Sequence, residues 1–180
     1  MSQCRCICTY LVPEIVGLLP LPEVWGQILS TLLSTCSRYV KPSHMIVRSI
    51  DCDARCQRYE NIDRYVQCVE HCLVIAEVEA PYYAQYVRNI LLQKLLSIVK
   101  RFKSENIHVL TDDEDNPAVC YSDETSTVLL WLHVRWVKHG DTIQITVTPV
   151  LIHCTPPETC DEVLSNVEYI CEECFQNPYE

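Results

Sequence analysis

Cysteine offers this chain more chemistry than any other residue type. The 180 residues include 13 cysteines, whose thiols can bind a metal, form disulfides or act as nucleophiles. Their number is odd, they lie within hydrophobic patterns, and no convincing secretory signal precedes them. This pattern favours reduced thiols in an intracellular, reducing compartment, either the nucleus or the cytoplasm.

Two groups of residues have spacings that a zinc site could use. Cys52-x3-Cys56 and Cys68-x3-Cys72 together offer four thiolates. The second group consists of His153, Cys154, Cys171 and Cys174. Structural zinc needs four ligand atoms within about 2.3 Å of one point, and neither group has the paired CxxC spacing that is typical of such sites.

The same cysteines also fit the hydrophobic stripes of predicted helices. If residues 158–175 form one helix, a single face holds Cys160, Val163, Leu164, Val167, Ile170, Cys171 and Cys174. Free cysteine packs as a small hydrophobe. We therefore expect neither a metal nor another cofactor, and zinc bound by Cys52, Cys56, Cys68 and Cys72 is the alternative.

The glycines exclude the common phosphate-binding loops. The chain has 3 glycines, Gly17, Gly26 and Gly140, too far apart for GxGxxG or GxxxxGK[ST], and it has no GxSxG elbow. A thiol enzyme would need a cysteine beside a histidine. With 13 cysteines and 6 histidines, such pairs arise by chance, so we expect no enzyme and no catalytic residue.

The charge balance limits the partners. With 14 basic and 24 acidic side chains, the formal net charge is −10, which opposes direct binding to nucleic acid. The N-terminal apolar run is interrupted by Pro13, Glu14 and Pro20, so we expect it to belong to the folded domain and not to enter a membrane. Residues 111–126 are rich in aspartate and glutamate, and we expect them to form an exposed acidic loop.

The remaining patterns predict one α+β domain over residues 1–180, with about four helices packed on a small antiparallel sheet. Helical periodicity or capping signals predict helices over 22–40, 61–79, 82–104 and 158–175, with Asn61 as an N-cap and Pro81 as a break. Short strands are expected at 44–50 and 106–110. Alternating residues predict a β-hairpin over about 127–148 that turns at Gly140, and Pro149 indicates that its second strand ends there or lies at an edge of the sheet.

The predicted helix 82–104 has apolar residues on two sides. Leu92, Leu96 and Val99 lie well away from its main apolar stripe, and burial of one side does not explain them. The helix predicted over 22–40 has few charges on its polar face. We therefore expect Leu92, Leu96 and Val99 to bind a protein partner, with helix 22–40 as a second surface.

These observations favour a non-catalytic protein–protein interaction subunit or adaptor of a larger intracellular complex. The acidic charge permits a nuclear, chromosome-associated complex, in which the chain would act through a basic partner. A zinc-stabilised interaction module is the first alternative, and a thiol-dependent enzyme is the second.

Overall fold

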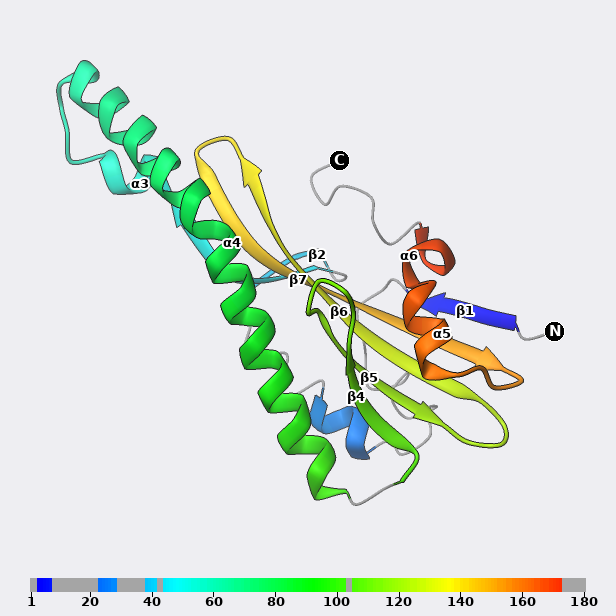
Figure 1. Ribbon diagram of the computed structural model, residues 1–180. Coiled ribbons are helices and arrows are strands. Elements are labelled where there is room, and N and C mark those ends of the chain that lie inside the picture. The colour runs from blue at the N-terminus through cyan, green and yellow to red at the C-terminus, as the bar shows by residue number, and fades with distance from the viewer. Residues whose placement is uncertain (1–2, 8–22, 29–37, 42–43, 103–104, 173–180) are drawn as a thin grey trace.

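The computed structural model describes residues 3–7, 23–28, 38–41, 44–102 and 105–172. Its centre is a seven-stranded antiparallel sheet with strand order β2-β3-β7-β6-β5-β4, in which β1 also pairs with β7 (Figure 1). The strands are β1 (Gln3–Ile7), β2 (Arg38–Lys41), β3 (His44–Asp51), β4 (Ile107–Thr111), β5 (Pro117–Ser122), β6 (Thr127–His139) and β7 (Thr142–Thr155). The predicted α+β class is confirmed, but the sheet is larger than expected.

The predicted hairpin is confirmed as β6 and β7, which turn at Gly140 with φ +58°. Both alternatives at Pro149 are wrong, because β7 continues to Thr155 and is paired on both sides, with β6 and with β3 and β1. On the other side of β7, β3 pairs with residues up to Val147, and β1 pairs from Leu151 onward. Pro149 therefore lies between two partner strands, where its missing N–H costs no ladder hydrogen bond to either of them.

One long helix, α4 (Ile62–Arg101), crosses a face of the sheet (Figure 1). The predicted N-cap is confirmed, since Asn61 Oδ1 accepts hydrogen bonds from the backbone N–H of Asp63 at 2.9 Å and of Arg64 at 3.2 Å. The predicted break at Pro81 is wrong, because the helix continues through it. Proline removes one helical hydrogen bond, but α4 is anchored on both sides of it by a buried line. That line is Val69, Ala76, Ala80, Ala84, Val87, Leu91, Leu95 and Ile98.

Helices cover both faces of the sheet. α4 and the helical residues 23–28 pack against one face, through a cluster that includes Leu130, Leu132, Val134, Ile145 and Val147. The short helices α5 (Cys160–Ser165) and α6 (Val167–Ile170) pack against the other, through a cluster that includes Leu129, Trp131, Val150 and Ile152. Because helices cover both faces of the sheet, the middle of β6 carries apolar side chains on both of its sides.

Two more of the predicted helices differ from the structure. The helix predicted over 22–40 is helical at 23–28, but its end is strand β2, and residues 29–37 lie outside the described part. The helix predicted over 158–175 is divided into α5 and α6 at Asn166.

The acidic loop predicted over 111–126 is wrong in its middle, because β5 occupies Pro117–Ser122 and its first five side chains are buried. The acidic residues lie in the turns on either side of β5. Because β5 pairs with both β4 and β6, its apolar side chains belong to the core even though acidic turns flank it.

The core beneath α4 gives a direct test of the packing. Leu95 has 1% of its surface exposed, whereas its neighbour Leu96 has 44% exposed. Leu95→Ala should lower the free energy of unfolding by about 2–5 kcal/mol, because it leaves a cavity in the core. Leu96→Ala, the matched control, should lower it by less than about 1 kcal/mol. Urea unfolding of the oxidised protein measures both, and equal losses would contradict this orientation of the helix.

Candidate functional site

All ten cysteines among the described residues are joined in disulfides. The pairs are Cys4–Cys154, Cys6–Cys171, Cys52–Cys72, Cys56–Cys68 and Cys120–Cys160. The prediction of reduced thiols is therefore wrong for these ten, whereas the prediction that they pack in the hydrophobic core is confirmed. Disulfides persist in oxidising environments and are rare in reducing ones, so the predicted reducing compartment fits this structure poorly.

The four cysteines proposed as zinc ligands do come together, but as two disulfides. Cys52 and Cys56 lie on the short helix α3 (Cys52–Cys56), and Cys72 and Cys68 face them from α4. Spacings of four residues put both cysteines of each helix on one side, which allows two parallel bridges. Zinc binds thiolates, and these sulfur atoms are bonded to each other.

A hydrogen bond supports the same junction. The Tyr65 hydroxyl of α4 donates to the Asp53 carboxylate of α3, and this bond raises the pKa of Tyr65 to about 12. Asp51 caps α3 by accepting from the backbone N–H of Ala54 at 3.1 Å. The beginning of α4 is thus attached to α3 by two covalent bonds and one hydrogen bond.

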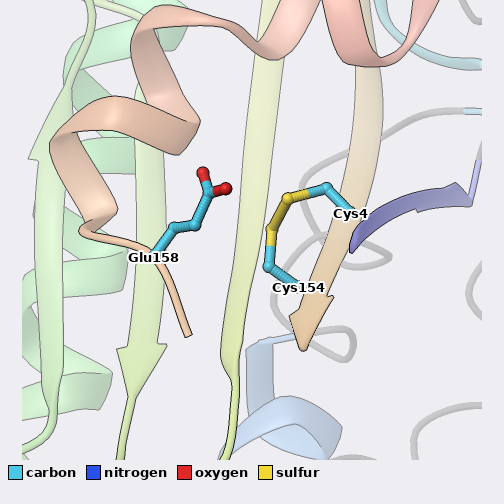
Figure 2. A group of neighbouring side chains, drawn as sticks. All are labelled: Cys4, Cys154 and Glu158. Atoms are coloured by element: carbon cyan, nitrogen blue, oxygen red, sulfur yellow. A yellow bond between two sulfur atoms is a disulfide. The ribbon is translucent and has the colours of Figure 1, made fainter. Parts of the chain in front are cut away.

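The second predicted ligand group is also taken up by disulfides. Cys154 is bonded to Cys4 and Cys171 to Cys6, while Cys174 lies outside the described residues. Figure 2 shows the Glu158 side chain beside the Cys4–Cys154 bond. A carboxylate next to two sulfur atoms could contribute to a metal site only if the disulfide were reduced, because the disulfide sulfurs offer no thiolate.

An acidic hollow of about 480 Å³ opens beside Trp131 and is bordered by Asp112, Asp113, Glu114 and Glu168, among others. Asp112 already accepts four hydrogen bonds. The donors are the backbone N–H of Glu114 and Asn116, the Asn116 side-chain amide and the Trp131 indole, at 2.9, 2.9, 3.0 and 2.8 Å. These bonds fix the β4–β5 turn and leave Asp112 little capacity to act as a base.

The alternation of residues in the sequence places Trp131, His133 and Arg135 on one face of the hairpin, opposite its Leu/Val stripe, and this pattern predicts a solvated sheet face. That expectation is wrong for Trp131, which is buried and stacks on the His133 ring at 4.7 Å between centroids. Burial, together with the positive charge of Arg135, lowers the pKa of His133 to about 4. His133 is therefore neutral at pH 7 and belongs to the packing of this face.

The least expected surface is a line of large apolar side chains on the solvent side of α4. Val74, Val78, Tyr82 and Tyr86 follow one another every four residues and have 62%, 64%, 76% and 63% of their surface exposed. We call these four residues the exposed face of α4. A helix that packs on a sheet usually presents charged and polar residues to solvent, so this face lacks the composition of an ordinary solvated surface.

The residues predicted to bind a partner lie nearer the end of α4. Leu96 is 44% exposed, whereas Leu92 and Val99 are partly buried and Val99 packs against the core. Binding by these three residues stays a prediction. The line of four on the exposed face was missed because the predicted break at Pro81 divided it between two helices.

Comparison with protein-family models, curated proteins and solved structures finds no match for this chain. None of the helices in the described ranges is long and apolar enough to cross a membrane. The chemistry must therefore be argued from the residues alone.

Peptide mapping tests the disulfides at the α3–α4 junction. Digestion of the unreduced protein should release peptides that join Cys52 to Cys72 and Cys56 to Cys68, and these should separate on reduction. Mass spectrometry identifies both pairs. Four alkylatable thiols together with one equivalent of bound zinc would instead support the metal alternative.

The low pKa of His133 predicts a dependence of stability on pH. The unfolded chain takes up this proton near pH 6.5 and the folded chain only near pH 4, so the contribution of neutral His133 is complete above about pH 6.5 and is lost as the pH falls toward 4. His133→Phe keeps a ring against Trp131 without a titrating group. Its unfolding free energy, measured in urea, should fall less between pH 6.5 and 4 than that of the unchanged protein, and equal falls would refute this role.

Proposed function

We propose that this protein is a non-catalytic, disulfide-stabilised binding domain that docks a protein partner on the exposed face of α4. The observation that carries the proposal is the row Val74, Val78, Tyr82 and Tyr86, four large exposed apolar side chains on one helix. Single exposed hydrophobes are common on protein surfaces, but a contiguous group marks an interaction site.

The side chains on the exposed face of α4 suit protein recognition. Tyrosine is enriched at protein interfaces because it offers a large apolar ring and a polar hydroxyl. Burying one such side chain contributes roughly 1.5–3 kcal/mol, so four together can anchor a partner. The anchors also lie on a rigid helix, which reduces the entropy lost on binding.

The structural setting favours a binding role over an enzymatic one. Each cysteine among the described residues is in a disulfide, and a disulfide sulfur is no nucleophile. The acidic hollow beside Trp131 contains Asp112, whose carboxylate holds a turn. Neither the disulfides nor the acidic hollow offers an observation in favour of a reaction that compares with the exposed face of α4 as an observation in favour of binding.

Site-specific photocrosslinking tests the docking face. A benzophenone amino acid is introduced at Tyr82 in one variant and at Tyr169 in another, because both tyrosines are highly exposed, at 76% and 86%. In the cells that produce the protein, the probe at position 82 should capture a discrete protein species on irradiation. The probe at position 169, on α6, should not capture it.

A charge introduced into the exposed face of α4 gives the control for this crosslinking experiment. Val78→Glu should leave the melting temperature almost unchanged, since Val78 is exposed, and it should abolish capture by the probe at position 82. Capture of the same species from both positions, or capture that survives Val78→Glu, would refute docking on this face.

A further inference from the structure

Two cavities lie along one side of α4, next to the exposed face. The first, of about 520 Å³, is lined on α4 by Cys68, Cys72, Ile75 and Glu79, among others. The second, of about 360 Å³, is lined on α4 by Tyr83, Tyr86, Ile90 and Lys94, together with Val87. Apart from Val87, steps of three and four residues place these eight side chains on one continuous line, which we call the lateral line of α4. From Cys68 to Lys94 it extends about 39 Å.

The walls opposite α4 come from β3 and from the segment around α3. Arg55, Arg58 and Tyr59 border the first cavity, and Val47 and Arg48 border the second. Tyr86 belongs both to the second cavity and to the exposed face, so the two surfaces are continuous.

The cavity walls carry a charge opposite to that of the whole protein. Their lining residues include the cations Arg48, Arg55, Arg58 and Lys94 and a single carboxylate, Glu79. Four of the chain's 14 basic side chains therefore gather here, although the chain has a net charge of −10. A local positive region on an acidic protein attracts negatively charged groups and repels basic ones.

Tyrosines hold two of these arginines at the cavity walls. The Arg48 guanidinium lies over the Tyr83 ring, 3.9 Å from its centroid, and the Arg58 guanidinium lies 4.9 Å from the Tyr59 centroid. Within the described residues, neither arginine forms an ion pair with a carboxylate of this chain. An arginine over an aromatic ring keeps donors available for a carboxylate ligand.

We infer that the partner docked on α4 contributes an acidic segment with interspersed apolar side chains, and that this segment lies along the lateral line. This inference rests on the proposed function. The apolar side chains would enter the two cavities, against Ile75 and Ile90, while the carboxylates would meet Arg48, Arg55, Arg58 and Lys94. The apolar lining favours a protein segment over a purely charged polymer.

A second copy of this chain suits the surface less well. The cavity walls carry four cations and one carboxylate, so a symmetric pair of copies would place like charges against each other. Two copies with a charge of −10 each would also repel.

The test uses a defined probe, a fluorescein-labelled amphipathic peptide of about 18 residues built from glutamate and leucine. Fluorescence anisotropy should show binding that weakens as the salt concentration is raised, because charge attraction is screened. Arg48→Glu/Lys94→Glu and Arg55→Glu/Arg58→Glu should each weaken it about tenfold or more. Arg64→Glu/Lys100→Glu is the matched control, because it makes the same charge change on exposed residues of α4 that lie outside both cavities. It should weaken peptide binding much less.

Three results would overturn the inference. The first is a failure of charge selectivity: a peptide with lysine in place of glutamate binds as tightly as the glutamate peptide or more tightly, or the charge-reversed variants bind the glutamate peptide as tightly as the unchanged protein does. The second is binding of a heparin fragment without binding of the peptide, which would indicate a site for a sulfated polymer. The third is a dimer in analytical ultracentrifugation that the peptide fails to dissociate, which would identify a second copy as the occupant.

The inference and the proposed function fail separately. If the probe at position 82 still captures its partner in Arg48→Glu/Lys94→Glu as well as in the unchanged protein, docking on α4 stands and the acidic segment is wrong. If position 82 captures nothing specific in either protein, docking on α4 itself is wrong.

Discussion

The support of α4 along its length is the constraint on which the rest of this structure depends. Small side chains at Ala76, Ala80 and Ala84 allow the helix to lie close to the sheet, and Leu91 and Leu95 fill the space further along. Arg88 adds hydrogen bonds to Asn116 Oδ1 at 2.9 Å and to the Val134 carbonyl at 2.8 Å. Toward its beginning, α4 lies beside α3 (Figure 1), and two disulfides join the two helices. Because one side of α4 is fixed in this way, Val74, Val78, Tyr82 and Tyr86 must face solvent.

The parts of the fold that follow from local pattern were predictable. Alternating residues identified β6 and β7, and the short polar side chain of Asn61 identified the start of α4. The predicted break at Pro81 was wrong. Proline strongly destabilises the interior of an isolated helix, but here buried residues on both sides of Pro81 keep the helix continuous. In the acidic stretch, aspartates in two turns concealed the apolar strand β5 between them. Long-range pairing with β4 and β6 decides that strand, and no local signal reports it.

The cysteines show a different limit of sequence reasoning. The spacings of Cys52, Cys56, Cys68 and Cys72 predicted that these residues could meet, and they do. Spacing alone does not determine whether sulfur atoms bind zinc, bind each other or remain thiols. The candidate docking surface depended in turn on the continuity of α4, because the four-residue repeat from Val74 to Tyr86 is visible only when Pro81 does not divide it.

Methyl-resolved NMR of the oxidised protein, titrated with the glutamate–leucine peptide, distinguishes docking on α4 from binding elsewhere on the protein. Signals of Val74, Ile75, Val78 and Ile90 should shift together, with a common saturation point. The methyl groups of Val163, Leu164 and Val167, on the opposite side of the sheet, should not move. Shifts confined to α5 and α6, or no shifts along α4 at saturating peptide, would contradict docking on α4.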